Sequence, residues 1–149
     1  MLTRLAAILT FSAATAAVGC TDNTAEDFLG SWTYSSGEFR IDCGPQQMVF
    51  PADSTLIETL VAGEATDLSK SDTAGCLGIT FDVAGRVASL SPSPQACQIP
   101  GMGTSTADTY TLTLSSDGKT LTAASVGTFL APGAPAPCTF TGGGTLTKQ

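Results

Sequence analysis

The sequence contains no histidine. Histidine is the commonest general base at neutral pH and a common metal ligand, so a Ser/His/Asp triad and a histidine-bound zinc ion are excluded. The five cysteines show no C-x-x-C spacing, which argues against a redox-active pair and against a thiolate zinc site. We therefore predict a protein that is not an enzyme and that holds no metal and no cofactor.

Charged side chains are also scarce. They make up 13% of the chain, and acidic residues outnumber basic ones 13 to 6, giving a net charge of −7. An acidic surface repels phosphate backbones, which excludes nucleic acid as a partner. No cluster of basic residues is present that could bind anionic lipids, so membrane association would depend on a separate anchor.

The first 19 residues have the layout of an export signal. Arg4 precedes an apolar run, residues 5–18, that is rich in alanine and hydroxyl residues and is shorter than the roughly 20 residues of a membrane span. Cys20 follows directly. The segment resembles a bacterial lipoprotein signal, in which a four-residue lipobox ends in a cysteine that is diacylated before cleavage. Ala17 stands where that family usually has leucine. A plain signal peptide cleaved nearby is the alternative.

The resemblance implies a protein of the bacterial envelope, lipid-anchored through Cys20 on the periplasmic side of a membrane or on the cell surface. Residues 1–19 would be the signal peptide, 20–27 a short polar tether, and 28–149 a single β domain. Two acyl chains give stable anchoring, whereas one chain binds a membrane only marginally. The membrane is thus the first expected partner.

The cysteine count agrees with acylation, because removing Cys20 from five cysteines leaves an even set. Four cysteines allow three connectivities. Cys76 and Cys97 bracket a hairpin expected to turn at residues 84–85, so we predict that they pair. The remaining bond would join Cys43, at the end of the second expected strand, to Cys138, at the start of the last.

Alternation of apolar and polar residues predicts strands along the whole β domain. Two strands are expected to meet in a turn at Ser36–Gly37, and Asp117–Gly118 is a strong hairpin signal. Residues 98–106 and 131–137, rich in glycine, proline or alanine, are expected to be loops. The remaining strands are expected over residues 54–62, 66–71 (weakly), 77–83, 86–90, 109–114, 121–129 and 138–146.

Eight or nine short antiparallel strands at hairpin spacing, with no helical period after the signal segment, predict an all-β fold. An up-and-down barrel and a sandwich are both compatible with this pattern.

The first strand carries Gly30-Ser31-Trp32, which resembles the G-x-W opening of lipocalins and avidins. In those families the indole closes the bottom of a small barrel. Lipocalins usually stack a basic residue of the last strand on this tryptophan, and Lys148 stands at the corresponding place. The resemblance implies a barrel closed by Gly30, Trp32 and Lys148. Alternatively, Trp32 is simply a core aromatic residue.

Two other sequence patterns are weaker evidence for a ligand or metal site. Gly118-Lys119-Thr120 matches the end of a phosphate-binding loop, but Thr113 takes the place of the first glycine, so a hairpin turn explains it better. Residues 66–72 offer oxygen atoms but lack the acidic spacing of a calcium loop.

Paired carboxylates are the one catalytic arrangement that the composition leaves open. The candidates are Glu38, Asp42, Glu58 and Asp82, of which Glu38 and Asp42 fall on the polar face of one strand. We predict a non-enzymatic envelope lipoprotein whose β domain binds a small apolar ligand or an envelope protein, or has a structural role. The alternative is a carboxylate-dependent envelope hydrolase.

Overall fold

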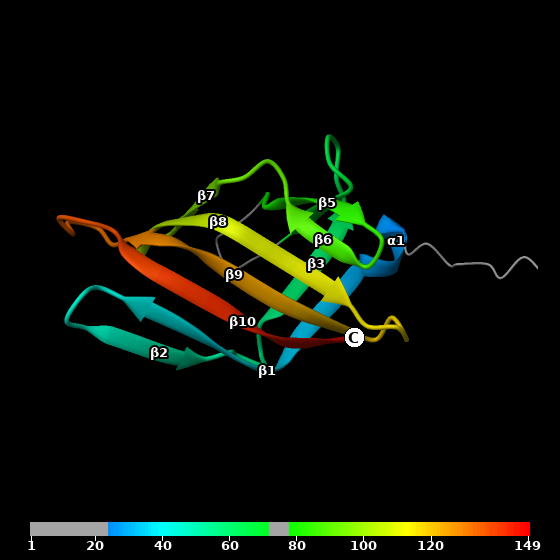
Figure 1. Ribbon diagram of the computed structural model, residues 1–149, viewed down its shortest axis with the longest axis horizontal. Coiled ribbons are helices and arrows are strands. Elements are labelled where there is room, and N and C mark those ends of the chain that lie inside the picture. The colour runs from blue at the N-terminus through cyan, green and yellow to red at the C-terminus, as the bar shows by residue number, and fades with distance from the viewer. Residues whose placement is uncertain (1–23, 72–77) are drawn as a thin grey trace, which may run out of the picture.

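The computed structural model describes residues 24–71 and 78–149 (Figure 1). A four-residue helix, α1 (Ala25–Phe28), precedes ten strands. The strands are β1 (Gly30–Asp42), β2 (Gln47–Pro51), β3 (Ile57–Ala62), β4 (Leu68–Ser71), β5 (Thr80–Ala84), β6 (Val87–Leu90), β7 (Gln95–Ile99), β8 (Gly103–Leu114), β9 (Thr120–Leu130) and β10 (Cys138–Lys148).

Eight of these strands close into an antiparallel barrel in the order β1-β3-β4-β5-β6-β8-β9-β10, and β10 pairs back with β1. The predicted all-β antiparallel fold is confirmed, as a barrel and not a sandwich. The two further strands extend the wall at one end only. β2 pairs with the second half of β1, and β7 pairs with the first half of β8.

The predicted turn at Ser36–Gly37 is wrong, because β1 continues through these residues as one 13-residue strand. Its register with β10 shifts between Tyr34 and Ser36, where β1 has one extra residue. Before this residue the even-numbered side chains Trp32 and Tyr34 face inward, and after it the odd-numbered Phe39 does. Gly37 is needed for a close approach of two backbones: a Cβ there would lie 2.3 Å from the Gly143 carbonyl oxygen. A glycine that looks like a turn signal therefore serves strand packing.

The predicted loop over residues 98–106 is also wrong. These residues form the end of β7 and the start of β8, joined by a tight turn in which the Met102 N–H donates to the Ile99 carbonyl. The proline and the first glycine of the stretch, Pro100 and Gly101, are confined to that turn. β2 was not predicted: residues 44–47 were expected to break the chain after the second strand, but β2 already begins at Gln47.

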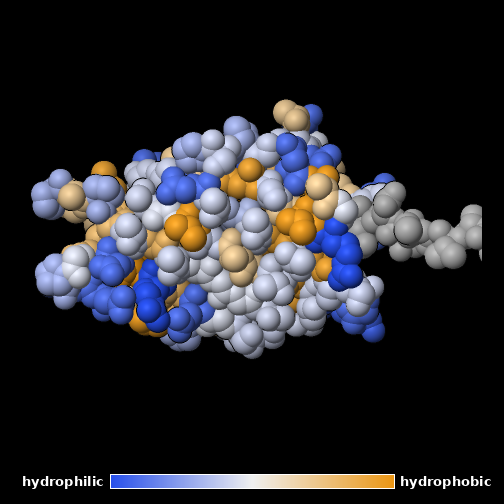
Figure 2. Space-filling model, in the orientation of Figure 1, coloured by the Kyte–Doolittle hydropathy of each residue, from blue (hydrophilic) through white to orange (hydrophobic). Residues whose placement is uncertain are grey.

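The hairpin signal at Asp117–Gly118 is confirmed, because β8 and β9 meet there. The β5–β6 hairpin also forms, with its turn at Gly85–Arg86, one residue later than expected. The face over β8, β9 and β10 seen in Figure 2 is mostly of intermediate hydropathy. This agrees with the threonines that alternate with apolar residues along these strands.

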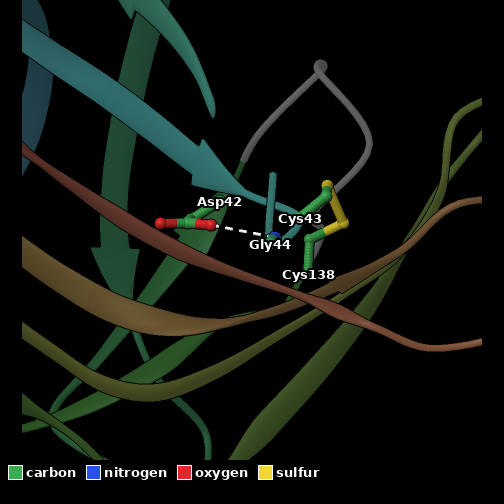
Figure 3. Close-up of a disulfide and its surroundings, with 4 residues drawn as sticks. All are labelled: Asp42, Cys43, Gly44 and Cys138. Carbon is green, nitrogen blue, oxygen red and sulfur yellow. Dashed lines mark hydrogen bonds between the residues drawn. A yellow bond between two sulfur atoms is a disulfide. The ribbon is translucent and has the colours of Figure 1, made fainter. Parts of the chain in front are cut away.

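The disulfide between Cys43 and Cys138 is confirmed. It links the end of β1 to the start of β10 (Figure 3), two strands that are paired along almost their whole length. The Asp42 carboxylate beside it accepts a hydrogen bond from the Gly44 N–H at 3.0 Å. Cys97 is also disulfide-bonded, but its predicted partner Cys76 lies outside the described residues.

The predicted signal peptide and its lipidation site, Cys20, lie outside the described residues as well. Helix α1 takes in the last residues of the predicted tether and ends in Phe28, which is completely buried. Within residues 24–71 and 78–149, no helix has the length and apolar character needed to cross a membrane.

Candidate functional site

One end of the barrel is filled by large side chains, and we call it the closed end. Trp32 is completely buried there, and its indole N–H donates a 2.9 Å hydrogen bond to the Phe28 carbonyl. The other fully buried residues around it are Phe28, Leu114 and Leu146, with Leu121 almost fully buried. α1 and the C-terminus lie at this end (Figure 1).

The structure places Gly30, Trp32 and Lys148 together at the closed end. The Lys148 ammonium lies 5.1 Å from the centre of the Trp32 ring and donates to the Asp27 carbonyl at 3.2 Å. The first distance is that of a cation–π contact. Gly30 has a φ of 124°, and a Cβ at this position would touch Lys148 Cε at 3.4 Å. Glycine therefore suits both the backbone and the lysine.

The inward side chains become smaller away from the closed end. Along β9 they run Leu121, Ala123, Ser125 and Gly127, and their partners on β10 include Gly144 and Gly142. A barrel of eight strands is just wide enough for side chains to fill it or for one small ligand to enter. The small residues on β9 and β10 thus leave space inside.

That space is a cavity of about 160 Å³ inside the barrel, between the closed end and the Cys43–Cys138 disulfide. Several of its lining side chains are only half-buried, so solvent reaches it from the end opposite Trp32, which we call the open end. The lining residues are Tyr34, Phe39, Glu58, Lys70, Ile79, Gln95, Cys97, Ser105, Ala107, Tyr110, Ser125 and Phe140.

Two phenylalanines form the wall of the cavity near the open end, and each lies against a glycine. A Cβ at Gly142 would lie 2.3 Å from Cδ1 of Phe39, and one at Gly127 would lie 2.7 Å from Cε1 of Phe140. Phe39 also makes an edge contact with Tyr34, with ring centres 5.8 Å apart. The glycines let the aromatic rings lie close to the sheet.

Four polar side chains, Tyr34, Glu58, Lys70 and Tyr110, form a polar cluster at the inner part of the cavity. Lys70 Nζ donates to Glu58 Oε1 at 3.0 Å, and the Tyr110 hydroxyl donates to Glu58 Oε2 at 3.2 Å. Glu58 and Lys70 are each only 9% exposed. Burying two opposite charges costs several kcal/mol of desolvation each, which the pairing roughly offsets.

The environment of the cluster also fixes the state of Tyr34. Burial, followed by the nearby Tyr110 hydroxyl and the Glu58 carboxylate, raises the pKa of Tyr34 well above its usual value. Its phenol therefore stays protonated over the whole physiological range. The cavity then contains one negative charge, one positive charge and neutral hydroxyl groups.

The four candidate carboxylates are not brought together. Glu58 points into the barrel, whereas Glu38, Asp42 and Asp82 lie exposed on its outer side. Glu38 pairs with Arg40 at 3.2 Å on the surface. Among the residues that line the cavity, Glu58 is the single acid.

The remaining candidates have local structural contacts. Asp67 Oδ2 accepts the Val83 N–H at 2.7 Å, and Asp72 lies outside the described residues. Asp117 accepts hydrogen bonds from the Ser115 hydroxyl and from the Lys119 N–H, as a hairpin turn requires. No three acidic or cysteine side chains in residues 24–71 and 78–149 are grouped so that they could hold a metal ion.

The sequence reasoning did not identify Lys70, Tyr34 or Tyr110 as site residues. A signal was present, because alternation puts Lys70 in phase with Leu68 and puts Glu58 in phase with Leu60. An acid and a base that each occupy an inward position of neighbouring strands predict a buried ion pair. The pairing of Leu60 with Lys70 places the two on adjacent strands.

In comparisons with known proteins, no family model, no curated protein and no solved structure matches the chain.

Proposed function

We propose that this protein is an exported lipoprotein, anchored through Cys20, whose barrel binds a small and mainly apolar ligand. The observation that carries the proposal is the cavity of about 160 Å³ with aromatic walls and a buried polar cluster. Protein interiors are normally packed to the density of organic crystals, so a cavity of this size has a stability cost. A cavity of similar volume, about 150 Å³, binds benzene in another protein.

The polar cluster favours ligand binding over a purely structural role. Replacing a buried ion pair by apolar side chains is often neutral or stabilising, so a barrel selected only for stability has no need of Glu58 and Lys70. Ligand sites, in contrast, combine mainly apolar walls with a few placed polar groups. The cavity follows that pattern, because its aromatic walls surround a few polar groups that contact one another.

The cavity does not favour the alternative of a carboxylate-dependent hydrolase. Glycosidases use two carboxyl groups about 5 to 10 Å apart on either side of the scissile bond. Glu58 has no second carboxylate among the cavity residues, and both its oxygens accept hydrogen bonds.

The binding part is tested with the full-length Cys20→Ser chain, which carries no lipid on residue 20 and so avoids detergent as a competing ligand. We expect toluene to raise its melting temperature, and the rise should grow with the logarithm of the toluene concentration once that concentration exceeds Kd. Ala107→Leu fills the cavity and should abolish the effect. Ala124→Leu is the matched control, because Ala124 is exposed on β9. Binding that survives Ala107→Leu would refute the proposal, and so would the failure of both toluene and its polar analogues of the same size to bind.

The anchoring part is tested separately on the wild-type protein expressed in a bacterium that lipidates its exported proteins. Mass spectrometry of the N-terminal peptide should show a diacylglyceryl thioether on Cys20. An unmodified Cys20, or a mature chain that begins elsewhere, would contradict it without affecting the binding proposal.

A further inference from the structure

The charges inside the cavity cancel, and both charged groups already have partners. Glu58 accepts one hydrogen bond from Lys70 and one from the Tyr110 hydroxyl, through different oxygens. Lys70 lies also 5.8 Å from the centre of the Tyr110 ring. The polar cluster is therefore a neutral unit that needs no counter-charge from a ligand.

Outside the polar cluster, the largest polar side chain in the wall, Gln95, is equally engaged. The Gln95 side-chain oxygen accepts the Thr80 N–H at 2.9 Å, and its nitrogen donates to the carbonyls of Thr80 and Pro92 at 3.0 and 2.8 Å. Among residues 24–71 and 78–149, Glu58 and Lys70 are the charged side chains that line the cavity. A charged ligand would therefore meet no unpaired charge of opposite sign.

A charged group directed at the polar cluster could bind there only by breaking the existing pair. A cation would compete with Lys70 for Glu58, and an anion would compete with Glu58 for Lys70. In both cases one protein charge would be left buried without its partner, which costs several kcal/mol. A neutral hydroxyl or amide group can add to the cluster without displacing either charge.

The volume of the cavity sets a second limit on the ligand. The cavity holds about 160 Å³, between Phe39 and Phe140 near the open end and the polar cluster further in. This is space for one six-membered ring with one or two small substituents. Aromatic rings in the wall favour an aromatic ligand, because ring pairs are more favourable than their buried area alone.

We infer that the cavity selects an uncharged, ring-sized ligand that carries one hydrogen-bonding group, such as a phenol. The inference rests on the proposed function, since it specifies which ligand that cavity accepts. The hydrogen-bonding group would face the polar cluster, and the apolar end of the ring would face Phe39 and Phe140.

Three probes of nearly equal shape test it on the full-length Cys20→Ser chain: p-cresol is neutral, p-toluate is an anion and 4-methylbenzylamine is a cation at pH 7. We expect p-cresol to bind at least about tenfold more tightly than either charged probe by titration calorimetry, because charge burial costs more than 1.4 kcal/mol. Toluene serves as the reference without a polar group, and p-cresol should also bind more tightly than toluene.

Two variants invert the preference. Glu58→Gln removes the carboxylate that pairs with Lys70 and so adds one positive charge to the cavity, and p-toluate should then become the tightest of the three probes. Lys70→Met leaves Glu58 as a single negative charge, and 4-methylbenzylamine should become the tightest. Circular dichroism shows whether each variant folds. If one does not fold, the affinities of the three probes for the chain with Glu58 and Lys70 intact still decide whether the cavity prefers a neutral ligand.

The outcomes separate the two proposals. If a charged probe binds the wild-type chain as tightly as p-cresol, or if p-cresol binds no better than toluene, the inference fails while the binding function stands. If neither toluene nor any of the three probes binds, the proposed function fails and this inference with it.

Discussion

The closed end and the open end of the barrel are built from the same long strands but are packed in opposite ways. At the closed end, Leu114, Leu121 and Leu146 surround a completely buried Trp32. Toward the open end, the same strands carry Ser105, Ser125 and Gly142 at inward positions. Side-chain size alone thus divides one barrel into a core and a cavity.

The difference shows that the two ends depend on different sources of stability. The closed end has buried apolar surface, each large side chain contributing about 1.5 to 3 kcal/mol. The open end has little of this, and it is joined instead by the Cys43–Cys138 disulfide and by the short additional strands β2 and β7. Substitutions at the two ends should therefore act through different mechanisms.

The largest expected effect comes from removing the disulfide of the open end. Cys43→Ser opens a bond that spans 95 residues and should lower the free energy of unfolding by about 4 to 5 kcal/mol, because the unfolded chain loses a long loop constraint. Cys138→Ser should lose the same amount. Cys97→Ser breaks the predicted shorter loop and should lose about 3 kcal/mol. Urea denaturation measures all three, and a larger loss for Cys97→Ser would contradict the order.

At the closed end, Trp32→Ala should lower the free energy of unfolding by about 3 to 5 kcal/mol, as for other large core aromatics. The matched substitution at the open end is Phe39→Ala, which should cost less than about 2 kcal/mol because Phe39 is half-buried beside the cavity. Equal losses in thermal or urea denaturation would show that the two ends are packed alike.

Between the two ends, the Glu58–Lys70 pair should be costly to break and easy to replace. Glu58→Gln removes the carboxylate that forms an ion pair with the buried Lys70 and should destabilise the protein by about 3 kcal/mol. The double variant Glu58→Leu with Lys70→Met removes both charges and should be close to wild type or more stable. A double variant as unstable as the single one would mean that the pair itself stabilises the barrel.

The smallest effect is a pH dependence in the alkaline range. Burial raises the pKa of Tyr34 on folding above its ordinary value of 10.0, so the unfolded chain loses this proton first. Stability is therefore fully present below about pH 10 and should fall by about 1.4 kcal/mol per pH unit above it. Tyr34→Phe should show a shallower alkaline slope in urea titrations between pH 9 and 11. An unchanged slope would mean that Tyr34 ionises as easily in the folded state.

The barrel could be predicted because most of its strands alternate clearly. Tyr110, Leu112 and Leu114 face inward opposite Ser125, Ala123 and Leu121, and the Asp117–Gly118 turn sets their register. The end of β7 and the start of β8 were missed because the inward side chains there, such as Cys97 and Ser105, line a cavity and are not apolar core residues. Alternation of apolar and polar residues indicates that one face of a strand is buried in a core, and this signal weakens where the barrel interior is not filled by side chains.

The site was harder to predict for a related reason. Glu58 and Lys70 carry opposite charges and lie in separate strands. Only the pairing of Leu60 with Lys70 brings them to the same side of the wall. Sequence reasoning placed acids on the outer face by default, which holds for Glu38 and Asp42. The same rule fails for Glu58, because the opposite charge of Lys70 offsets the cost of burying the carboxylate.

Helix α1 and the C-terminus meet at the closed end, and this has a consequence for orientation. The Gln149 N–H donates to the Ser31 carbonyl at 2.9 Å, and α1 leads into β1 at the same place. With a lipid on Cys20, residues 21–24 would span at most about 14 Å, so the closed end would rest near the bilayer surface. The open end, at the far end of the 13-residue β1, would face away from the membrane by roughly 40 Å. Such an orientation would have the barrel collect its ligand from the aqueous compartment and not from the lipid phase.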